Sequence, residues 1–318
     1  MPAIATIGFF DGVHKGHRYL FSQLQQYAMQ YNERSLLFTF LQHPRTVLAA
    51  MARAAGNSNS ETDSRQPDTY CPLLLTTVSE REQLLGSFGD VHFFDFAEVQ
   101  PLTALQFLDY LADRWKVRHL LMGYNHHFGS DGNLTDDQYQ AIAQQVGIRI
   151  IRALPYNEGG INPSSTIIRK ALTQGDVSAA NKLLGYEYML SGRVVHGRMI
   201  GRKMGFPTAN IMPEAGKLIP AAGVYKALVA GADTLLLSNS DSLAAPSAKQ
   251  VPALVNIGTN PTVGNTHQTI EVHIPGYAGD LYNRTLTLHF VERLRGEIRF
   301  NSIDELRAQI QIDLKSIQ

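Results

Sequence analysis

At 318 residues, the chain is longer than one compact domain usually is, so its length favours two domains. Its 28 Lys and Arg residues balance its 28 Asp and Glu residues, which excludes a global charge that attracts nucleic acid or an anionic membrane. A single cysteine excludes an internal disulfide framework. Since there is also no signal sequence and no run of about 20 apolar residues, we expect a cytoplasmic protein without a membrane span.

The chain opens with a predicted strand, Ala3 to Ile7, and a loop rich in glycine and histidine follows from Gly8 to His17. A helix is predicted next, because apolar residues recur at helical spacing at Leu20, Leu24, Ala28 and Tyr31. Backbone N–H groups at a helix N-terminus are unpaired and attract anions, and glycines let the backbone approach a ligand closely. The loop is therefore predicted to bind a nucleotide phosphate.

His14 and His17 lie three residues apart in this loop, so both can face one bound group from the first helical turn. An ordinary surface or capping role is the simplest alternative for either residue. A zinc pair is another alternative, but it needs at least one more ligand, and the only cysteine, Cys71, lies in a loop-like segment. The pattern therefore favours a phosphate over a metal.

Four further strands are predicted before residue 160, at 35–40, 91–94, 117–122 and 148–153. They alternate with helices, two of which begin with capping-box patterns at Thr103 and Thr135. The alternation predicts a Rossmann-like parallel sheet with flanking helices and with ligands at the carboxyl ends of its strands. Residues 50–70 lack apolar periodicity, and we expect them to form a mobile loop.

Two predicted loops follow strands of this sheet. The first runs from Gly123 to Gly129 and contains Asn125. The second begins a helix with the hydroxyl residues Ser164 to Thr166, and Arg169 follows one turn later. A helix N-terminus with an arginine fork of donors beside it can form a second anion site, although an ordinary N-cap with a surface arginine is the simpler alternative.

After Gly185 the pattern changes to short strands with frequent glycines and one terminal helix, which predicts a small antiparallel β-barrel. We therefore expect residues 1–185 and residues 186–318 to form separate domains. Within the second, Thr269 to Ile274 alternates as a strand with Glu271 on its polar face. Residues 231–249 form a second segment that is rich in Ser, Ala and Asp.

Three motifs resemble known signatures. The segment His14–His17 resembles the His-x-Gly-His signature of the nucleotidyltransferase superfamily, and residues 10–17 resemble its flavin branch. Residues 164–169 resemble that superfamily's Ser-Ser-Thr-x-x-Arg signature, and residues 201–211 resemble the riboflavin kinase signature. In this order the motifs resemble the prokaryotic bifunctional riboflavin kinase/FMN adenylyltransferase family, also called FAD synthetase. Five residues depart from the usual family pattern, namely His126, His127, Pro163, Met204 and Asn283.

The resemblance implies two ATP-dependent reactions. The C-terminal barrel would phosphorylate riboflavin to FMN and release ADP, and the N-terminal α/β domain would transfer AMP from ATP to FMN, giving FAD and pyrophosphate. Mg²⁺ is the implied metal, and Thr208 and Asn210 are its implied ligands. Glu271 would accept the proton of the riboflavin hydroxyl.

The resemblance also implies a set of site residues. The implied catalytic residues are His14, His17, Arg169 and Glu271. The implied nucleotide- and phosphate-binding residues are Gly8, Phe9, Asp11, Gly12, Gly16, Asn125, Ser164, Ser165, Thr166, Gly201, Lys203 and Gly205. The implied flavin-binding residues are Arg293, Arg295 and Phe300.

Two other functions are consistent with parts of the pattern. An adenylyltransferase for another phosphorylated cofactor precursor would leave residues 201–211 and Glu271 without a use. A non-catalytic flavin-binding protein would bind flavin but consume no ATP. The sequence itself does not predict the oligomeric state or communication between the two sites.

Overall fold

The computed structural model describes residues 1–54, 73–123, 126–132, 134–157, 160, 162–197, 201, 205–230, 250–262, 265–277 and 279–317. By packing, the chain divides into two compact units, one of residues 1–72 with 78–163 and one of residues 73–77 with 164–318. Within the described ranges, no helix is both long enough and apolar enough to cross a membrane.

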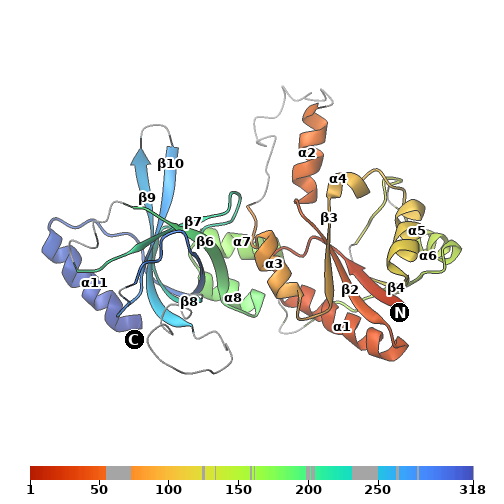
Figure 1. The fold of residues 1–318 in the computed structure, drawn as a ribbon, viewed down its shortest axis with the longest axis horizontal. Helices are drawn as coiled ribbons and strands as arrows, with labels where there is room; N and C mark the ends of the chain where they lie inside the picture. The colour runs from red at the N-terminus through yellow and green to blue at the C-terminus, as the bar shows by residue number, and fades with distance from the viewer. Residues whose placement is uncertain are drawn as a thin grey trace. The chain divides into compact units, whose positions relative to one another are not determined.

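The first unit is built on a five-stranded parallel sheet (Figure 1). The strand order, from the pairing of the strands, is β3-β2-β1-β4-β5. Its strands are β1 Ala3–Ile7, β2 Arg34–Phe40, β3 Asp90–Phe94, β4 Val117–Met122 and β5 Arg149–Arg152. From β1, the chain adds β2 and β3 on one side of the sheet and then β4 and β5 on the other side. The crevice at the carboxyl ends of β1 and β4 is therefore the topological switch point at which such sheets bind ligands.

Helices cover both faces of this sheet. They are α1 Lys15–Tyr31, α2 Pro44–Ala54, α3 Val78–Leu85, α4 Phe96–Val99, α5 Ala104–Trp115 and α6 Asp136–Gln145. Successive residues of β1 point to opposite faces, so Ile4 packs in one core with Leu24 and Leu85, and Ala5 packs in the other with Leu108. The predicted caps at Thr103 and Thr135 are confirmed as complete capping boxes.

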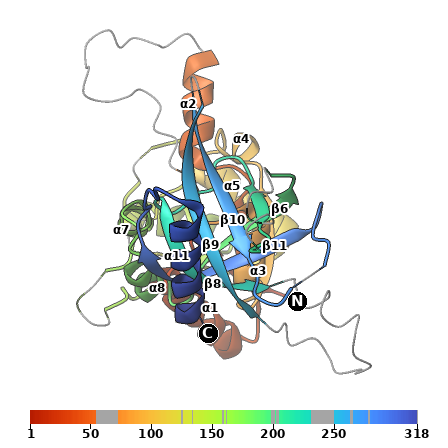
Figure 2. The ribbon, with the colours of Figure 1, turned by 90° about the vertical axis from the view of Figure 1, so that its left-hand side faces the viewer.

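The second unit contains a closed antiparallel barrel of six strands in the order β10-β7-β6-β11-β8-β9. Its strands are β6 Tyr188–Val195, β7 Ala209–Pro213, β8 Gly223–Ala230, β9 Val251–Thr262, β10 Asn265–His273 and β11 Thr285–Arg295. The terminal helix α11, Ile303–Ile317, packs on the outside of the barrel (Figure 2), where Ile317 meets Val224 and Leu254. The predicted fold class, a parallel α/β sheet followed by a small β-barrel with a terminal helix, is confirmed.

Two helices before the barrel belong to its core. They are α7 Ser165–Thr173 and α8 Val177–Leu184, and Leu172 and Leu184 are buried together with Tyr188 and Phe290 of the barrel. The Asn181 side chain donates to the Phe290 carbonyl at 2.8 Å and accepts from the Tyr188 N–H at 2.8 Å. Packing therefore divides the chain near residue 164, about one helix pair before the boundary at 185 that the sequence pattern predicts.

A short segment from the middle of the first unit's sequence also packs with the barrel. The Leu74 N–H donates to the Gly216 carbonyl at 2.7 Å, and the Leu218 N–H donates to the Leu74 carbonyl at 2.8 Å. Lys217 is buried, and its ammonium donates to the Leu75 carbonyl at 2.6 Å. Residues 73–77 are thus fixed to the second unit by both backbone and side-chain hydrogen bonds.

Three sequence expectations need correction or fall outside the structure. The expected loop over residues 50–70 is wrong for residues 50–54, which continue α2 after Pro44 begins it at a position that suits proline. Residues 55–72, with the rest of the expected loop, and the Ser-, Ala- and Asp-rich residues 231–249 lie outside the described residues. Helical spacing in the sequence predicts that Ile303 shares the packed face of the last helix with Ile310 and Leu314, but Ile303 is 65% exposed, whereas Ile310 and Leu314 pack in a cluster with the buried Ile317.

Candidate functional site

The loop after β1 has an unusual backbone. Phe10, Gly12 and Val13 have φ angles of 52°, 78° and 37°, which lie in the left-handed region. A β-branched residue such as valine rarely adopts this conformation, and backbone strain of this kind is typical of functional sites. The Val13 N–H closes the turn by donating to the Phe10 carbonyl at 3.0 Å.

The helix that follows begins with the histidine pair. His14 is the N-cap of α1, and its Nδ1 accepts from the His17 N–H at 3.4 Å. The two rings are stacked with their centroids 3.7 Å apart and their planes 16° apart. The first turn of α1, whose residues are all described, contains no acidic side chain that would compete with an anion for this helix end.

Burial controls the charge of this pair. It lowers the pKa of His14 from 6.5 to about 4, against the opposing influence of the nearby Asp11 carboxylate. The pKa of His17 is lowered well below 6.5 by burial and by His14. Both rings are therefore neutral near pH 7, and an adjacent phosphate would raise both pKa values. Nδ1 of His17 is buried without a hydrogen-bond partner among the described residues.

A cavity of about 410 Å³ lies at the same edge of the sheet. Most of its wall is aromatic or apolar, and two histidines contribute polar atoms. The lining residues include Phe9, Phe40, Leu48, Phe96, Phe107, His126, His127 and Phe128. Its size and lining are those of a small-molecule site that holds a flat apolar group. Gly8 and Phe9 border this cavity, so the loop and the cavity form one candidate site.

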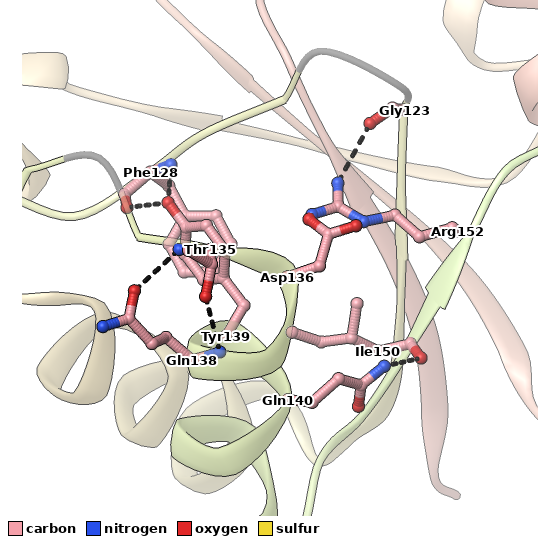
Figure 3. A network of polar contacts seen from close by, with 9 residues as sticks. All are labelled: Gly123, Phe128, Thr135, Asp136, Gln138, Tyr139, Gln140, Ile150 and Arg152. Carbon is pink, nitrogen blue, oxygen red and sulfur yellow. Dashed lines mark hydrogen bonds and ion pairs between the residues drawn. The ribbon is translucent and has the colours of Figure 1, made fainter.

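The loop after β4 is held in place by a network of polar contacts (Figure 3). The Tyr139 hydroxyl donates to the Phe128 carbonyl at 2.7 Å and accepts from the Phe128 N–H at 2.9 Å. Arg152 donates to the Gly123 carbonyl at 3.3 Å and pairs with Asp136. Asn125, predicted to bind phosphate, lies outside the described residues, and sequence reasoning did not identify Tyr139 as the residue that fixes this loop.

His126 in this loop is also neutral near pH 7. Burial lowers its pKa to about 4, and the charges of His127 and Arg152 lower it in the same direction. The cavity wall is thus uncharged at this position, which suits an apolar ligand.

The second predicted anion motif lies at the start of α7. Ser164 is the N-cap, as predicted, and its Oγ accepts from the Ile167 N–H at 3.4 Å. Ser165 and Thr166 form the first turn, and the Arg169 Nε donates to the Leu73 carbonyl at 2.8 Å. These residues belong to the second compact unit, whereas His14 and His17 belong to the first.

A separate polar cluster lies on the barrel. Glu271 on β10 is opposite Asn210 on β7, and the Thr208 hydroxyl donates to the Glu271 carboxylate at 3.5 Å. A Cβ at Gly197 would collide with the Asn210 side chain, and a Cβ at Gly201 would collide with the Phe206 carbonyl. Glycine is therefore required where the preceding loop approaches this cluster, whereas Lys203 lies outside the described residues.

A second cavity, of about 660 Å³, adjoins this cluster. Pro207, Thr208 and Ala209 line one part of it, and residues 279–282 line another. Tyr282 also stacks on His196, with ring centroids 3.9 Å apart. Gly205 has a φ of 87°, so the turn before Pro207 also requires glycine. The structure thus brings Thr208, Asn210 and Glu271 together beside a cavity.

The residues predicted to bind flavin have protein partners. The Arg295 guanidinium donates to both Asp313 carboxylate oxygens, with Nη2 at 2.7 Å, and to the Gly296 carbonyl at 3.1 Å. Arg293 donates to the Ala222 carbonyl at 2.6 Å. The centroid of the Phe300 ring lies 6.0 Å from the guanidinium carbon of Arg295. The role of Asp313 was not visible in the sequence, because it lies 18 residues from Arg295 on an otherwise ordinary amphipathic helix.

Comparisons with known proteins match both halves of the chain. A FAD synthetase family model matches residues 1–167, and a riboflavin kinase family model matches residues 184–318. The bifunctional riboflavin kinase/FMN adenylyltransferase of Escherichia coli K12 is 34% identical over 315 residues, which cover 98% of this chain and 90% of the relative. The protein of the same description from Pseudomonas fluorescens is 32% identical, with the same coverage.

A solved structure is similar as well. The crystal structure of a Streptococcus pneumoniae protein described as a macrolide-efflux protein covers 99% of this chain and 93% of its own, with a TM-score of 0.76 and 27% identity. The FAD synthetase model covers the half of the chain with the histidine pair, and the riboflavin kinase model covers the half with Glu271. The two relatives are matched over 90% of their own length. The chain therefore belongs to the family of bifunctional riboflavin kinase/FMN adenylyltransferases.

Proposed function

We propose that the two reactions of this family are carried out by the two groups of residues described above. The loop from Gly8 to His17 and its aromatic cavity serve FMN adenylylation, and the cluster of Thr208, Asn210 and Glu271 serves riboflavin phosphorylation. The observation that carries the proposal is the neutral, stacked histidine pair at the N-terminus of a helix, beside a cavity whose wall is mostly aromatic and apolar. These features match a phosphate joined to a flat ring system.

Adenylylation requires positioning and charge stabilisation rather than a base. An FMN phosphate oxygen attacks the α-phosphorus of ATP, the bond to the bridging oxygen breaks, and pyrophosphate leaves. The FMN phosphate is already ionised near pH 7, so no protein group needs to take a proton from it. The N–H groups of α1 and the rings of His14 and His17 would donate to the transferring phosphate.

Further phosphate contacts are proposed from their place in the motifs. They are Gly8, Phe9, Asp11, Gly12, Gly16, Asn125, Ser164, Ser165 and Thr166, with Arg169 as an additional donor. For Ser164 to Thr166, support comes from their position in the cap and first turn of α7, where N–H groups and hydroxyls can bind an anion together. For Phe9, support comes from its place in the cavity wall.

Phosphorylation requires a base and a metal. The riboflavin hydroxyl oxygen attacks the γ-phosphorus of ATP, Glu271 accepts the hydroxyl proton, and ADP leaves. The Thr208 hydroxyl and the Asn210 amide oxygen, beside a carboxylate, are the hard oxygen donors that suit Mg²⁺. When bound there, Mg²⁺ would neutralise charge on the ATP phosphates. Gly201, Lys203 and Gly205 are proposed to contact these phosphates from the loop before Pro207.

The remaining proposals concern the flavin end, the domains and the location. Arg293, Arg295 and Phe300 are proposed to border riboflavin, with Arg295 acting by holding the loop rather than by direct donation, because its donors are occupied by Asp313 and Gly296. Residues 1–185 and 186–318 are proposed as the functional domains. A cytoplasmic location is proposed from the single cysteine.

Two variants test the assignment. Glu271→Gln keeps the shape of the side chain but removes the proton acceptor, so FMN formation from riboflavin should fall by about 10² to 10⁴-fold. Conversion of supplied FMN to FAD should continue. His17→Ala should show the reverse, with FMN accumulating, because it removes a phosphate donor worth about 10² to 10³-fold in rate.

Chromatography of flavins after incubation with ATP, Mg²⁺ and either riboflavin or FMN measures both reactions, and each variant serves as the control of the other. The two-site assignment is contradicted if folded Glu271→Gln loses both activities. It is also contradicted if His17→Ala makes FAD at the wild-type rate.

A further inference from the structure

Arg81 on α3 is a fully buried cation in the first unit. Its exposure is 0%, and it is among the largest of the fully buried side chains. Burial lowers its pKa from 12.5 to about 10, and the negative charge of Asp11 opposes this change. The guanidinium is therefore still charged near pH 7, in a place where an apolar side chain would avoid the loss of hydration.

Few hydrogen bonds compensate this charge. Nη2 donates to the Phe40 carbonyl at 2.5 Å, whereas Nε and Nη1 are buried with no hydrogen-bond partner among the described residues. The guanidinium carbon lies 4.2 Å from the centroid of the Phe9 ring and 5.5 Å from that of Phe93. Nε and Nη1 are inaccessible to solvent, so in this arrangement they would not contact a ligand bound in the cavity.

The contacts of Arg81 join two strand ends next to the candidate site. Phe40 is the last residue of β2, and Phe9 is the second residue of the loop after β1. Phe9 in turn borders the 410 Å³ cavity and makes an edge contact with His43, with ring centroids 4.5 Å apart. The Phe9 carbonyl also accepts from the Thr39 hydroxyl at 3.1 Å. Arg81 therefore packs on the ring of Phe9, a residue that also lines the cavity.

Arg81 also shares an electrostatic neighbour with the histidine pair. Asp11 is 3% exposed, and its charge raises the pKa of both Arg81 and His14. A carboxylate buried in a phosphate-binding loop would repel an incoming phosphate. The cation of Arg81 offsets that repulsion.

We propose that Arg81 is a positioning residue for adenylyl transfer, which holds Phe9 against the cavity and offsets the charge of Asp11 without touching the substrates. This inference rests on the proposed function of the Gly8–His17 loop. A purely structural arginine would only fill volume, and methionine would then replace it without loss, because a poorly paired buried ion is often exchanged for an apolar residue at no expense in stability.

Two variants in the full chain test the proposal through FAD formation from FMN and ATP. Arg81→Met should lower kcat by about 10- to 100-fold, the effect of misplacing groups that contact the transition state. Arg81→Lys keeps the charge and a donor for the Phe40 carbonyl but lacks the planar group over Phe9. It should therefore lose only about 3- to 10-fold in kcat, with KM for FMN changed by less than about threefold in both variants.

The controls separate positioning from folding. Arg118→Met, which removes an exposed arginine from the same sheet, should change neither constant, and FMN formation from riboflavin should stay within about twofold in every variant. Fluorescence of Trp115, the only tryptophan in the chain, reports unfolding of the first unit.

Wild-type kcat in Arg81→Met overturns the proposal. A wild-type kcat in Arg81→Lys also overturns the proposal. If Arg81→Met does not fold, the kcat of Arg81→Lys alone tests the proposal. An equal loss of kcat in the two variants, accompanied by equal losses of melting temperature, assigns the residue to folding alone. If Arg81→Met keeps FAD formation while His17→Ala loses it, the loop functions as proposed and only the role of Arg81 is refuted.

Discussion

His14 and His17 are neutral side chains that sit where a charged ligand is expected to bind. Their neutrality follows from burial, which lowers the pKa of His14 to about 4 and that of His17 in the same direction. In the unfolded chain the same side chains have pKa values near 6.5. Between these values the native protein binds fewer protons than the unfolded chain, so the free energy of unfolding falls as the pH is lowered through this range.

The pH dependence of stability tests this charge state at the residue level. The lowered pKa of His14 contributes about 3 kcal/mol to the free energy of unfolding at neutral pH. Most of this contribution should be lost as the pH falls from 6.5 to 4. His14→Asn keeps a capping acceptor for the His17 N–H but takes up no proton, so its melting temperature should fall less than the wild-type value on acidification. Thermal unfolding followed by Trp115 fluorescence at pH 7, 6, 5 and 4.5 measures the difference. Parallel curves for the two proteins would show that folding does not lower the pKa of His14.

At the scale of one element, α11 is fixed to the barrel by a buried ion pair. The side chains of Arg295 and Asp313 are 17% and 5% exposed, and the Gln309 amide donates to the same carboxylate at 2.9 Å. Removal of one partner of such a pair leaves a buried charge without compensation.

Asp313→Ala should therefore destabilise the second unit by about 3 to 5 kcal/mol. The measurement is the temperature of half-inactivation of FMN formation after brief heating. Asp304→Ala is the matched control on the same helix, because Asp304 pairs with Arg307 at the surface, with side chains 90% and 45% exposed. It should cost less than about 1 kcal/mol. Equal effects of the two substitutions would mean that the buried pair does not hold the helix.

Some elements could be predicted from the sequence because local residues determine them. The helix starts at Thr103, Thr135 and Ser164 were visible in side chains that cap their own backbone. The four-residue helix α4, Phe96–Val99, was missed because it is shorter than one period of an apolar pattern. The assignment of residues 50–54 to a loop failed because the composition of the following segment masked the end of α2.

Tertiary partners could not be predicted in the same way. An apolar stripe on α8 predicts that the helix is buried, but it does not show that the barrel covers it. The burial of Arg81 could not be predicted, because arginine is almost never fully buried unless it is paired. The cluster of Thr208, Asn210 and Glu271 was predicted only through family resemblance. The register that places Glu271 of β10 opposite Asn210 of β7 cannot be predicted from the sequence of either strand alone.

At the scale of the whole molecule, the packing of α7 and α8 determines which fragment should fold. Ile168, Leu172, Val177 and Leu184 are buried in the same core as the barrel. A fragment that starts at residue 186 would lose this cover and expose Tyr188. Each buried aliphatic side chain contributes roughly 1.5 to 3 kcal/mol, so the loss is large relative to the stability of one domain.

Residues 164–318 should therefore melt at least about 10 °C above residues 186–318. Both fragments contain Thr208, Asn210 and Glu271, so whatever folds should make FMN but no FAD. Circular dichroism melting and a riboflavin phosphorylation assay on the two purified fragments provide the comparison. Equal melting temperatures would support the boundary at residue 185 and would limit α7 and α8 to a role outside the barrel.

The placement of residues 73–77 also sets an order in time. Leu75 leaves the ribosome long before Lys217, the residue whose ammonium it binds, because 142 residues separate them. At 5 to 20 residues per second, the interval is roughly 7 to 28 s. During that time the segment has been synthesised but its partners Gly216 to Leu218 do not yet exist. The N-terminal half of the chain therefore carries five residues that reach their native contacts only after the first two barrel strands, β6 and β7, have been synthesised.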